Sequence, residues 1–270
     1  MGIDVIVLAK NSERTMGNIL RQLRSQVPIE NLIIVYGTSR DKTREIALQY
    51  TEQVYWDEDK GLGAARNLGM MKSSSEIVAM VDTDVILPKN WFQNLARHFD
   101  KNDKVAAAVA TCIFGYGCPP LQKYHEIANS YREDQWGTHC ILFKREAILT
   151  VGNFNKRIKG AGEDLDIYKR LIKAGYQWIW DRDVVVYHPQ TLLENLKHNI
   201  WWARGVTSQN DGNAFSLFQL LGGELQIIKR GLFLAAVHPI LSLYIPVIDS
   251  IWLATDFRTR SLRQRRAATS

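Results

Sequence analysis

The stretch IVAMVDTDVILPKNW (77–91) begins as an apolar run and then presents two aspartates, Asp82 and Asp84, separated by one residue. A short run of apolar residues without a charge is typical of a strand that is buried on both faces of a sheet. Two carboxylates at the end of such a strand repel each other and lose hydration, so their position requires a stabilising partner. The stretch therefore predicts a strand over 76–82 and a functional reason for the acids that follow it.

Short apolar runs alternate with helical patterns on both sides of this stretch. Strands are expected at 4–9, 31–36, 52–56, 104–114 and 183–188, helices at 14–26, 40–51, 64–73, 89–99 and 163–176, a strand followed by a helix at 137–149, and a break at 117–122. This alternation with continuous apolar strands predicts an α/β fold with a parallel, doubly wound sheet that is flanked by helices. Ligands of such sheets bind at the carboxyl ends of strands, where Asp82 and Asp84 stand.

Composition sets the limits for this interpretation. The chain has 270 residues, of which 46% are hydrophobic, which suffices for one large α/β domain with an additional segment and argues against general disorder. The net charge of +6 allows an anionic partner such as a phosphorylated substrate, a membrane surface or nucleic acid. Three cysteines without a CxxC motif indicate neither a disulfide framework nor a zinc site, and the first residues do not resemble a signal peptide.

The character of the chain changes near residue 214. The segment 214–230 is amphipathic, and 231–255 is 25 residues long with Asp249 as its only formally charged side chain. That length could cross a bilayer, but the prolines and Asp249 favour a broken, re-entrant or interfacial helix equally well. The alternative is a buried helical hairpin that packs on the main domain.

The basic C-terminal tail favours membrane contact. Five arginines lie between residues 256 and 270, and arginines beside an apolar segment suit anionic lipid headgroups. We therefore divide the chain into a domain over 1–210 that binds the substrate and an apolar interfacial or transmembrane helical segment with a basic tail over 211–270.

The two aspartates suit a divalent metal ion. Asp82, Thr83 and Asp84 place two carboxylates on one loop, and oxygen-rich sites of this kind suit Mg²⁺ or Mn²⁺ shared with phosphate oxygens. Such a pair on its own is weak support, because an aspartate that begins a turn is common. His188 ends another predicted strand, so it could complete a metal set, or it could be structural.

Two glycine-containing stretches add candidate groups. In KGLGAARNLGM (60–70) the glycines permit a tight turn, and Arg66 follows at the start of a helix, an arrangement that suits an anion. In GAGEDLD (160–166), Glu163 and Asp164 either cap a helix or supply a general base.

The order of these motifs resembles that of family 2 glycosyltransferases of the GT-A fold. The resemblance covers about residues 1–210 and is carried by AKNSE (9–13), IIVYGTSRDKTREIA (33–47), GLGAARNLG (61–69), VDTD (81–84), GEDLD (162–166) and VVYHP (185–189). It implies a Rossmann-like GT-A fold, with a mixed and mostly parallel sheet that is flanked by helices and followed by C-terminal amphipathic or membrane helices. It also implies an inverting transfer from a nucleotide-diphosphate sugar, with a divalent metal ion, Mn²⁺ or Mg²⁺, on the diphosphate.

The same resemblance implies roles for individual residues. Asp164 corresponds to the catalytic base, and the metal ligands correspond to Asp82, Asp84 and His188. The implied donor-binding residues are Ala9, Asn11, Glu13, Tyr36, Arg66, Asp82, Thr83, Asp84 and Arg204. The segment HNIWWARG (198–205) is similar to an aromatic-plus-arginine region of the membrane-bound members of the family. Together with GEDLD (162–166), this similarity implies that the acceptor side is formed by Glu163, Trp201 and Trp202.

One position departs from the family pattern. Tyr36 stands where the family usually has an aspartate that hydrogen-bonds the nucleobase, and tyrosine cannot accept hydrogen bonds as a carboxylate does. GDP-sugars are therefore at least as compatible as UDP-sugars, and no residue of the sequence decides between them.

The acceptor is implied by the apolar C-terminal segment. That segment resembles the interface helices of dolichyl-phosphate sugar synthases and cellulose-synthase-like enzymes, and archaeal mannosyltransferases of this type are the most similar. The resemblance implies transfer, from GDP-mannose in the first instance, to a polyprenyl or dolichyl phosphate or a lipid-linked saccharide at the cytoplasmic side of a membrane.

Other functions remain open at this point. A UDP-sugar-dependent enzyme with another acceptor fits the same motifs. A nucleotidyltransferase would usually carry a glycine- and lysine-rich phosphate loop after the first strand, of which AKNSERTMG (9–17) is a weak version. A basic module that binds membranes or nucleic acid would leave Asp82, Asp84 and Asp164 unexplained, so a nucleic-acid partner is disfavoured.

Overall fold

The computed structural model describes residues 2–100, 102–133, 135–207 and 239–268. The chain divides into two compact units. The core unit comprises 1–113, 129–159 and 163–189, and the helical unit comprises 114–128, 160–162 and 190–270. The boundary that we expected at residue 210 lies outside the described residues.

The core unit is built on one seven-stranded sheet with the order β3-β2-β1-β4-β6-β5-β7. Its strands are β1 (Ile3–Ala9), β2 (Ile29–Tyr36), β3 (Val54–Trp56), β4 (Ile77–Asp82), β5 (Val105–Tyr116), β6 (Cys140–Lys144) and β7 (Gln177–Pro189). β1 pairs in parallel with β2 and β4, and β2 pairs in parallel with β3. β6 runs antiparallel to both β4 and β5, so the predicted mixed α/β sheet is confirmed.

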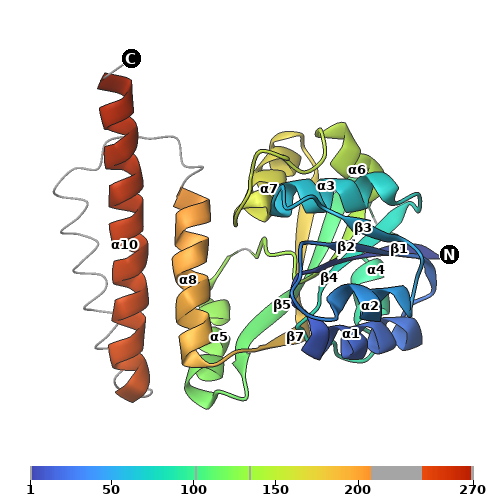
Figure 1. Cartoon of the computed structure of the whole chain (residues 1–270), viewed down its shortest axis with the longest axis horizontal. Coiled ribbons are helices and arrows are strands. Elements are labelled where there is room, and N and C mark those ends of the chain that lie inside the picture. The colour runs from blue at the N-terminus through green and yellow to red at the C-terminus, as the bar shows by residue number, and fades with distance from the viewer. Residues whose placement is uncertain (1, 101, 134, 208–238, 269–270) are drawn as a thin grey trace. The chain divides into compact units, whose positions relative to one another are not determined.

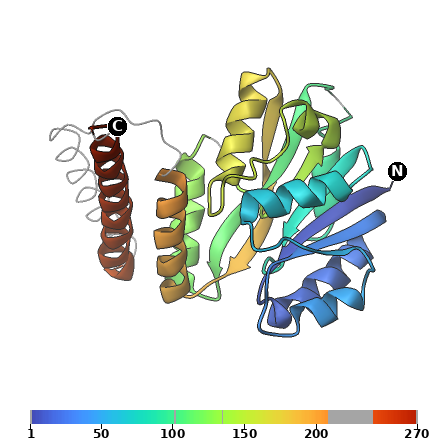
Figure 2. The ribbon, with the colours of Figure 1, turned by 45° about the horizontal axis from the view of Figure 1, so that its top comes forward.

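Helices cover both faces of this sheet (Figures 1 and 2). One face carries α3 (Leu62–Lys72), α6 (Arg145–Thr150) and α7 (Glu163–Lys173), and the other carries α1 (Glu13–Gln26), α2 (Thr43–Leu48) and α4 (Trp91–Ala96). α1 buries Met16, Ile19, Leu20 and Leu23, which recur at helical spacing and form the apolar stripe that the sequence indicates. α2 and α4 are shorter than the helices expected at 40–51 and 89–99.

The strand register brings the loops of the parallel half to one edge. Ala9, Tyr36 and Trp56, the last residues of β1, β2 and β3, lie in register, and Leu8 pairs with Asp82 at the end of β4. The loops that follow these four strands therefore begin at the same edge of the sheet, which is where parallel α/β sheets bind ligands.

The helical unit contains α8 (Leu192–Thr207), α10 (Pro239–Ala268) and most of α5 (Pro119–Tyr131). Polar contacts join α8 and α10: Tyr244 Oη donates to Asn195 Oδ1 at 2.9 Å, and Trp252 Nε1 donates to Asn199 Oδ1 at 3.1 Å. The break expected at 117–122 is wrong from Pro119 onward, because α5 begins there. Proline is tolerated in the first turn of a helix, where its missing N–H would have no intrahelical partner.

The predicted apolar segment is described only in part. Residues 214–238 lie outside the described residues, and 239–255 form the first part of α10. Within the described ranges, no helix combines the length and the apolar character needed to cross a membrane.

Candidate functional site

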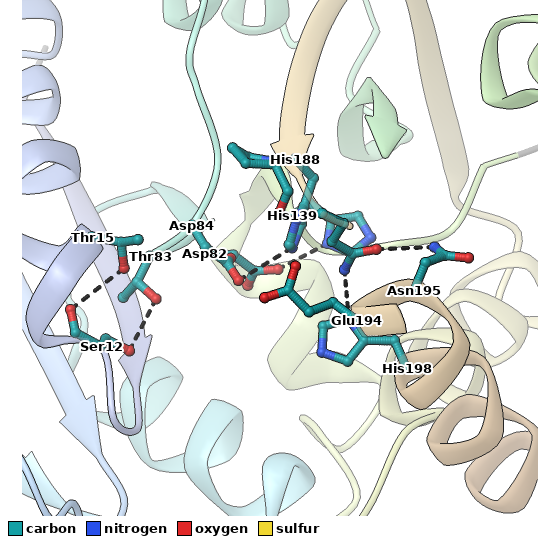
Figure 3. A network of polar contacts seen from close by, with 12 residues as sticks. Ser12, Thr15, Asp82, Thr83, Asp84, His139, His188, Glu194, Asn195 and His198 are labelled. Carbon is teal, nitrogen blue, oxygen red and sulfur yellow. Dashed lines mark hydrogen bonds and ion pairs between the residues drawn. The ribbon is translucent and has the colours of Figure 1, made fainter. Parts of the chain in front are cut away.

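Four side chains meet at the carboxyl end of β4 (Figure 3). Asp82 Oδ2 hydrogen-bonds His139 Nδ1 at 2.8 Å, and Asp84 Oδ2 lies 3.3 Å from His188 Nε2. The two imidazole rings meet edge to face, with their centroids 6.0 Å apart. The structure thus brings together Asp82, Asp84 and His188 and adds a fourth residue, while the metal-binding role of the three stays a prediction.

His139 is the residue that the sequence analysis missed. It immediately precedes β6, and the antiparallel pairing of β6 with β4 places the start of β6 beside the end of β4. The backbone N–H of Asp82 accordingly donates to the carbonyl of His139 at 3.0 Å. Only the direction of β6 could have revealed this residue, since it lies in a polar stretch without a strand-end pattern.

The charges of this cluster favour an ionised Asp82. Burial opposes ionisation, but the hydrogen bond to His139 and the positive charges of Arg66 and His188 outweigh it and lower the pKa of Asp82. Burial also opposes protonation of His188, yet its contact with Asp84 and the charge of Asp82 raise the pKa of His188. The negative charge of this cluster therefore attracts positively charged groups and cations.

The residue types at this position fit a divalent metal ion. Carboxylate oxygens together with imidazole nitrogen suit Mn²⁺ and accept Mg²⁺. The contacts are pairwise, however, and within the part of the chain that the structure describes no three histidine, cysteine, aspartate or glutamate side chains form a ready metal cluster.

A buried ion pair links α3 and α7 beside the cluster. Arg66 is 5% exposed, and its Nε donates to Glu163 Oε1 at 2.8 Å. Its guanidinium also lies 3.9 Å from Asp82 Oδ1. The start of α3 lies so close to the loop before α7 that a Cβ on Gly63 would lie 2.1 Å from the carbonyl oxygen of Asn155. This close approach holds Arg66 between Asp82 and Glu163.

Asp164 titrates near neutral pH. Burial and the neighbouring charge of Glu163 raise the pKa of Asp164 to about 7, although Arg66 opposes the shift. A carboxyl group with a pKa close to the working pH suits a general base. Glu163 itself is 2% exposed and bonded to Arg66, and its predicted place on the acceptor side stays a prediction.

A pocket of about 630 Å³ lies between the loops that follow β1 and β4. Four of the predicted donor-binding residues line it together: Asn11, Glu13, Thr83 and Asp84. Thr83 Oγ1 donates to Ser12 Oγ at 3.1 Å, which ties the two loops together (Figure 3). Ala9 and Tyr36 lie at the neighbouring strand ends, in register with each other.

The remaining predicted residues lie on α8 in the helical unit. Trp201 is 42% exposed, and the Trp202 ring lies 5.4 Å from the Phe114 ring and 5.5 Å from that of His198, measured between centroids. Arg204 is exposed. Their roles at the acceptor entrance and the diphosphate stay predictions.

Among curated proteins, three relatives are similar to this chain over half of its length or more. The pre-mycofactocin glycosyltransferase of Mycobacterium tuberculosis is 30% identical over 51% of this chain and 32% of its own length. Glycosyltransferase AglE of Haloferax volcanii is 27% identical over 67% of this chain and 63% of its own length. The glucosyl-dolichyl phosphate glucuronosyltransferase of the same organism is 22% identical over 60% of this chain and 59% of its own length. The chain thus spans less than two thirds of each relative.

The fold also resembles a solved structure. The mannosyltransferase PcManGT from Pyrobaculum calidifontis, determined in complex with GDP-Man and Mn²⁺, matches 95% of this chain and 86% of its own chain with a TM-score of 0.66 and 18% sequence identity. That likeness supports the fold predicted from the sequence.

The family model described as glycosyl transferase family 2 matches residues 4–157, which is more than half of the chain and includes β1 to β4 with Asp82 and Asp84. The three relatives carry glycosyltransferase names, two of them from an archaeon. The chain therefore belongs to glycosyl transferase family 2.

Proposed function

We propose that this chain is an inverting, metal-dependent glycosyltransferase that transfers a sugar from a nucleotide-diphosphate donor to a lipid acceptor. The favoured donor is GDP-mannose, and the acceptor is a polyprenyl or dolichyl phosphate or a lipid-linked saccharide. Family membership supports the reaction class. The mannosyltransferase fold neighbour and the relative named for dolichyl phosphate support the choice of donor and acceptor.

The observation that carries the proposal is the position of Asp82 and Asp84. Both lie at the carboxyl end of β4, His188 lies 3.3 Å from Asp84, and the guanidinium of Arg66 lies 3.9 Å from Asp82. A site that combines paired carboxylates with a buried arginine suits a diphosphate that arrives with a divalent ion.

The metal site would be formed by Asp82, Asp84 and His188. When bound there, Mn²⁺ or Mg²⁺ supplies a positive charge that stabilises the leaving diphosphate. Arg66 adds a fixed positive charge at the same place. Because this arginine is buried and held by Glu163, little reorganisation is needed as negative charge develops on the leaving group.

Asp164 would act on the acceptor. The acceptor oxygen forms a bond to the anomeric carbon while the bond from that carbon to the diphosphate oxygen breaks, and the acceptor hydroxyl proton moves to the Asp164 carboxylate. At a pKa of about 7, roughly half of this group is ionised at neutral pH. If the acceptor is a lipid phosphate, it is already ionised, and Asp164 then positions it.

The helical unit would contact the membrane. Leu243 and Val247, which lie four residues apart on α10, are 76% and 50% exposed, and Trp201 on α8 is 42% exposed. Exposed apolar side chains on a helix that continues into an arginine-rich segment suit the surface of an anionic bilayer. The active site would then act at the cytoplasmic side, with Arg204 at the diphosphate and Trp201 and Trp202 near the acceptor.

A transfer assay tests the proposal. The full chain is incubated with Mn²⁺, with vesicles that contain either dolichyl phosphate or a lipid-linked saccharide, and with radiolabelled GDP-mannose or, in parallel reactions, radiolabelled UDP-sugars. We expect label in the lipid fraction, and we expect Asp82→Ala and Asp84→Ala each to abolish it. Full activity of either variant would remove the metal role from the proposal, and transfer from UDP-sugars alone would support the alternative donor.

A further inference from the structure

The loop between β3 and α3 contains a turn with an unfavourable sequence. The N–H of Lys60 donates to the carbonyl of Asp57 at 3.2 Å, and the two central residues, Glu58 and Asp59, have φ angles of 55° and 52°. Positive φ at both central positions is the signature of a type I′ turn, which strongly prefers Asn-Gly. A backbone conformation of this kind at residues other than glycine is strained, and such strain clusters at functional sites.

The carboxylate of Asp59 joins three loops. Its Oδ1 accepts hydrogen bonds from Lys10 Nζ at 3.0 Å and from the backbone N–H of Thr38 at 3.1 Å. Lys10 follows β1 and Thr38 follows β2, so the contacts connect the loops of three adjacent strands. The Asp59 side chain is 39% exposed, so part of the carboxylate is open to a ligand.

This carboxylate is ionised at neutral pH. The contacts with Thr38 and Lys10 lower the pKa of Asp59 below its usual range. A permanent negative charge and the Lys10 ammonium therefore lie side by side, both accessible to a ligand, at the edge of the sheet that also carries Ala9 and Tyr36.

We propose that Asp59 supplies the base-reading carboxylate that Tyr36 does not, and that Asp59 and Lys10 together recognise guanine. This inference rests on the proposed function and assigns its donor to GDP-sugars. Oδ1 faces the N1–H of the base and Oδ2 faces its N2 amino group. Lys10 stands beside Oδ1, on the side where O6 of the base then lies, and donates to it.

The other common bases fit this pair poorly. Uracil offers a single N–H between two carbonyl oxygens, so the second carboxylate oxygen would face another acceptor. Adenine presents an acceptor nitrogen where guanine has N1–H. A site built around such hydrogen bonds rejects a ligand that leaves its groups unpaired.

Calorimetric binding of free nucleotides to the full chain with Mn²⁺ tests this assignment. The probes are GDP, UDP and IDP, which is GDP without the N2 amino group. We expect GDP to bind at least about 10-fold more tightly than IDP, because one hydrogen bond to a charged group is lost, and more tightly still than UDP.

The variant Asp59→Asn separates recognition from loop structure. Asparagine keeps Oδ1 for Thr38 but replaces Oδ2 with an amide that donates. We expect the ratio of GDP to IDP affinity to fall from about 10 to about 1, while UDP affinity changes less than about twofold. Glu58→Gln, an exposed neighbour in the same turn, is the matched control and should leave the ratio unchanged.

A second variant, Lys10→Met, removes the donor to O6. GDP and IDP both carry O6, so both should bind about 10-fold more weakly with their ratio preserved. A GDP to IDP affinity ratio that Asp59→Asn leaves unchanged would overturn the assignment while leaving the proposed function intact. Tighter binding of UDP than of GDP by the unmodified chain would overturn the assignment and favour a UDP-sugar as donor, with the proposed glycosyl transfer itself intact. If no nucleoside diphosphate binds in the presence of Mn²⁺, the guanine assignment and the proposed function are both wrong.

Discussion

Arg66 on α3 and Glu163 on α7 form a buried ion pair, with 2.8 Å between Nε and Oε1, and the next residue along α7 is Asp164. The pair joins two helices on one face of the sheet and sets the electrostatics of the candidate base. Glu163 raises the pKa of Asp164, and Arg66 opposes that effect while facing Asp82. One contact thus connects the candidate leaving-group side of the site to its acceptor side.

We expect Glu163→Gln to lower the stability of the folded chain and to change the acid limb of the pH dependence of activity. Removing one charge of a buried pair leaves Arg66 partly uncompensated, so the free energy of unfolding should fall by about 2 to 4 kcal/mol in urea titrations. Loss of the negative neighbour should also move the pKa of Asp164 toward its usual value, so activity should persist to lower pH. Glu45→Gln, on the exposed side of α2, is the control. An unchanged pH dependence of activity would argue against the electrostatic effect of Glu163 on Asp164.

The titration of Asp164 should be visible in the stability of the protein. Its pKa in the folded state, about 7, lies above its ordinary value of 3.8, so the folded chain binds more protons than the unfolded chain between these values. This group therefore stabilises the fold most below about pH 4, and the contribution is lost as pH rises toward 7. Urea titrations across this range should show that Asp164→Asn removes this part of the pH dependence. The same slope in the variant would contradict the assigned pKa.

Substitution of the two histidines of the cluster, His139 and His188, should affect metal affinity to different extents. His188→Ala should weaken Mn²⁺ binding about 10- to 100-fold, as expected for loss of a ligand or its immediate partner. His139→Gln retains a hydrogen-bonding group for Asp82 and should have a smaller effect. Electron paramagnetic resonance of free Mn²⁺ in titrations of the full chain measures both. If the two substitutions weaken Mn²⁺ binding equally, the proposed ligand set of Asp82, Asp84 and His188 is wrong.

The exposed apolar positions of α10 should matter for lipid binding. Leu243→Ser combined with Val247→Ser should reduce cosedimentation with vesicles containing anionic lipid, because less apolar area enters the interface. Leu48→Ser, at an exposed position of α2, is the matched control in the core unit. Binding should also weaken with added salt, since the arginine-rich segment contributes electrostatically. Vesicle binding that neither change affects would contradict the membrane proposal.

The fold was predictable to the extent that it follows from continuous apolar runs. Such runs identified β1, β2 and β4 and the edge at which they end. The direction of β6 was not predictable, because an apolar run fits a parallel and an antiparallel neighbour equally well. α5 was missed because Cys118 is followed by two prolines, which indicate a break but are also tolerated at the start of a helix.

The site was predictable where its residues end strands. Asp82 and His188 occupy such positions, and the structure brings them to one cluster. His139 depends on the pairing of β6 with β4, and the contact of Arg66 with Glu163 depends on how two helices pack. Neither is encoded by local pattern, since both arise only when distant segments meet.

The central claim is that Asp82 and Asp84 present a divalent ion to a nucleotide-diphosphate sugar. Thermal unfolding of the full chain with a panel of GDP- and UDP-sugars, with and without Mn²⁺, tests it most directly, because a ligand that binds only the folded state raises the melting temperature. We predict a rise with GDP-mannose that increases with Mn²⁺ and that is lost in Asp82→Ala. No shift with any donor in the presence of Mn²⁺ would contradict the account.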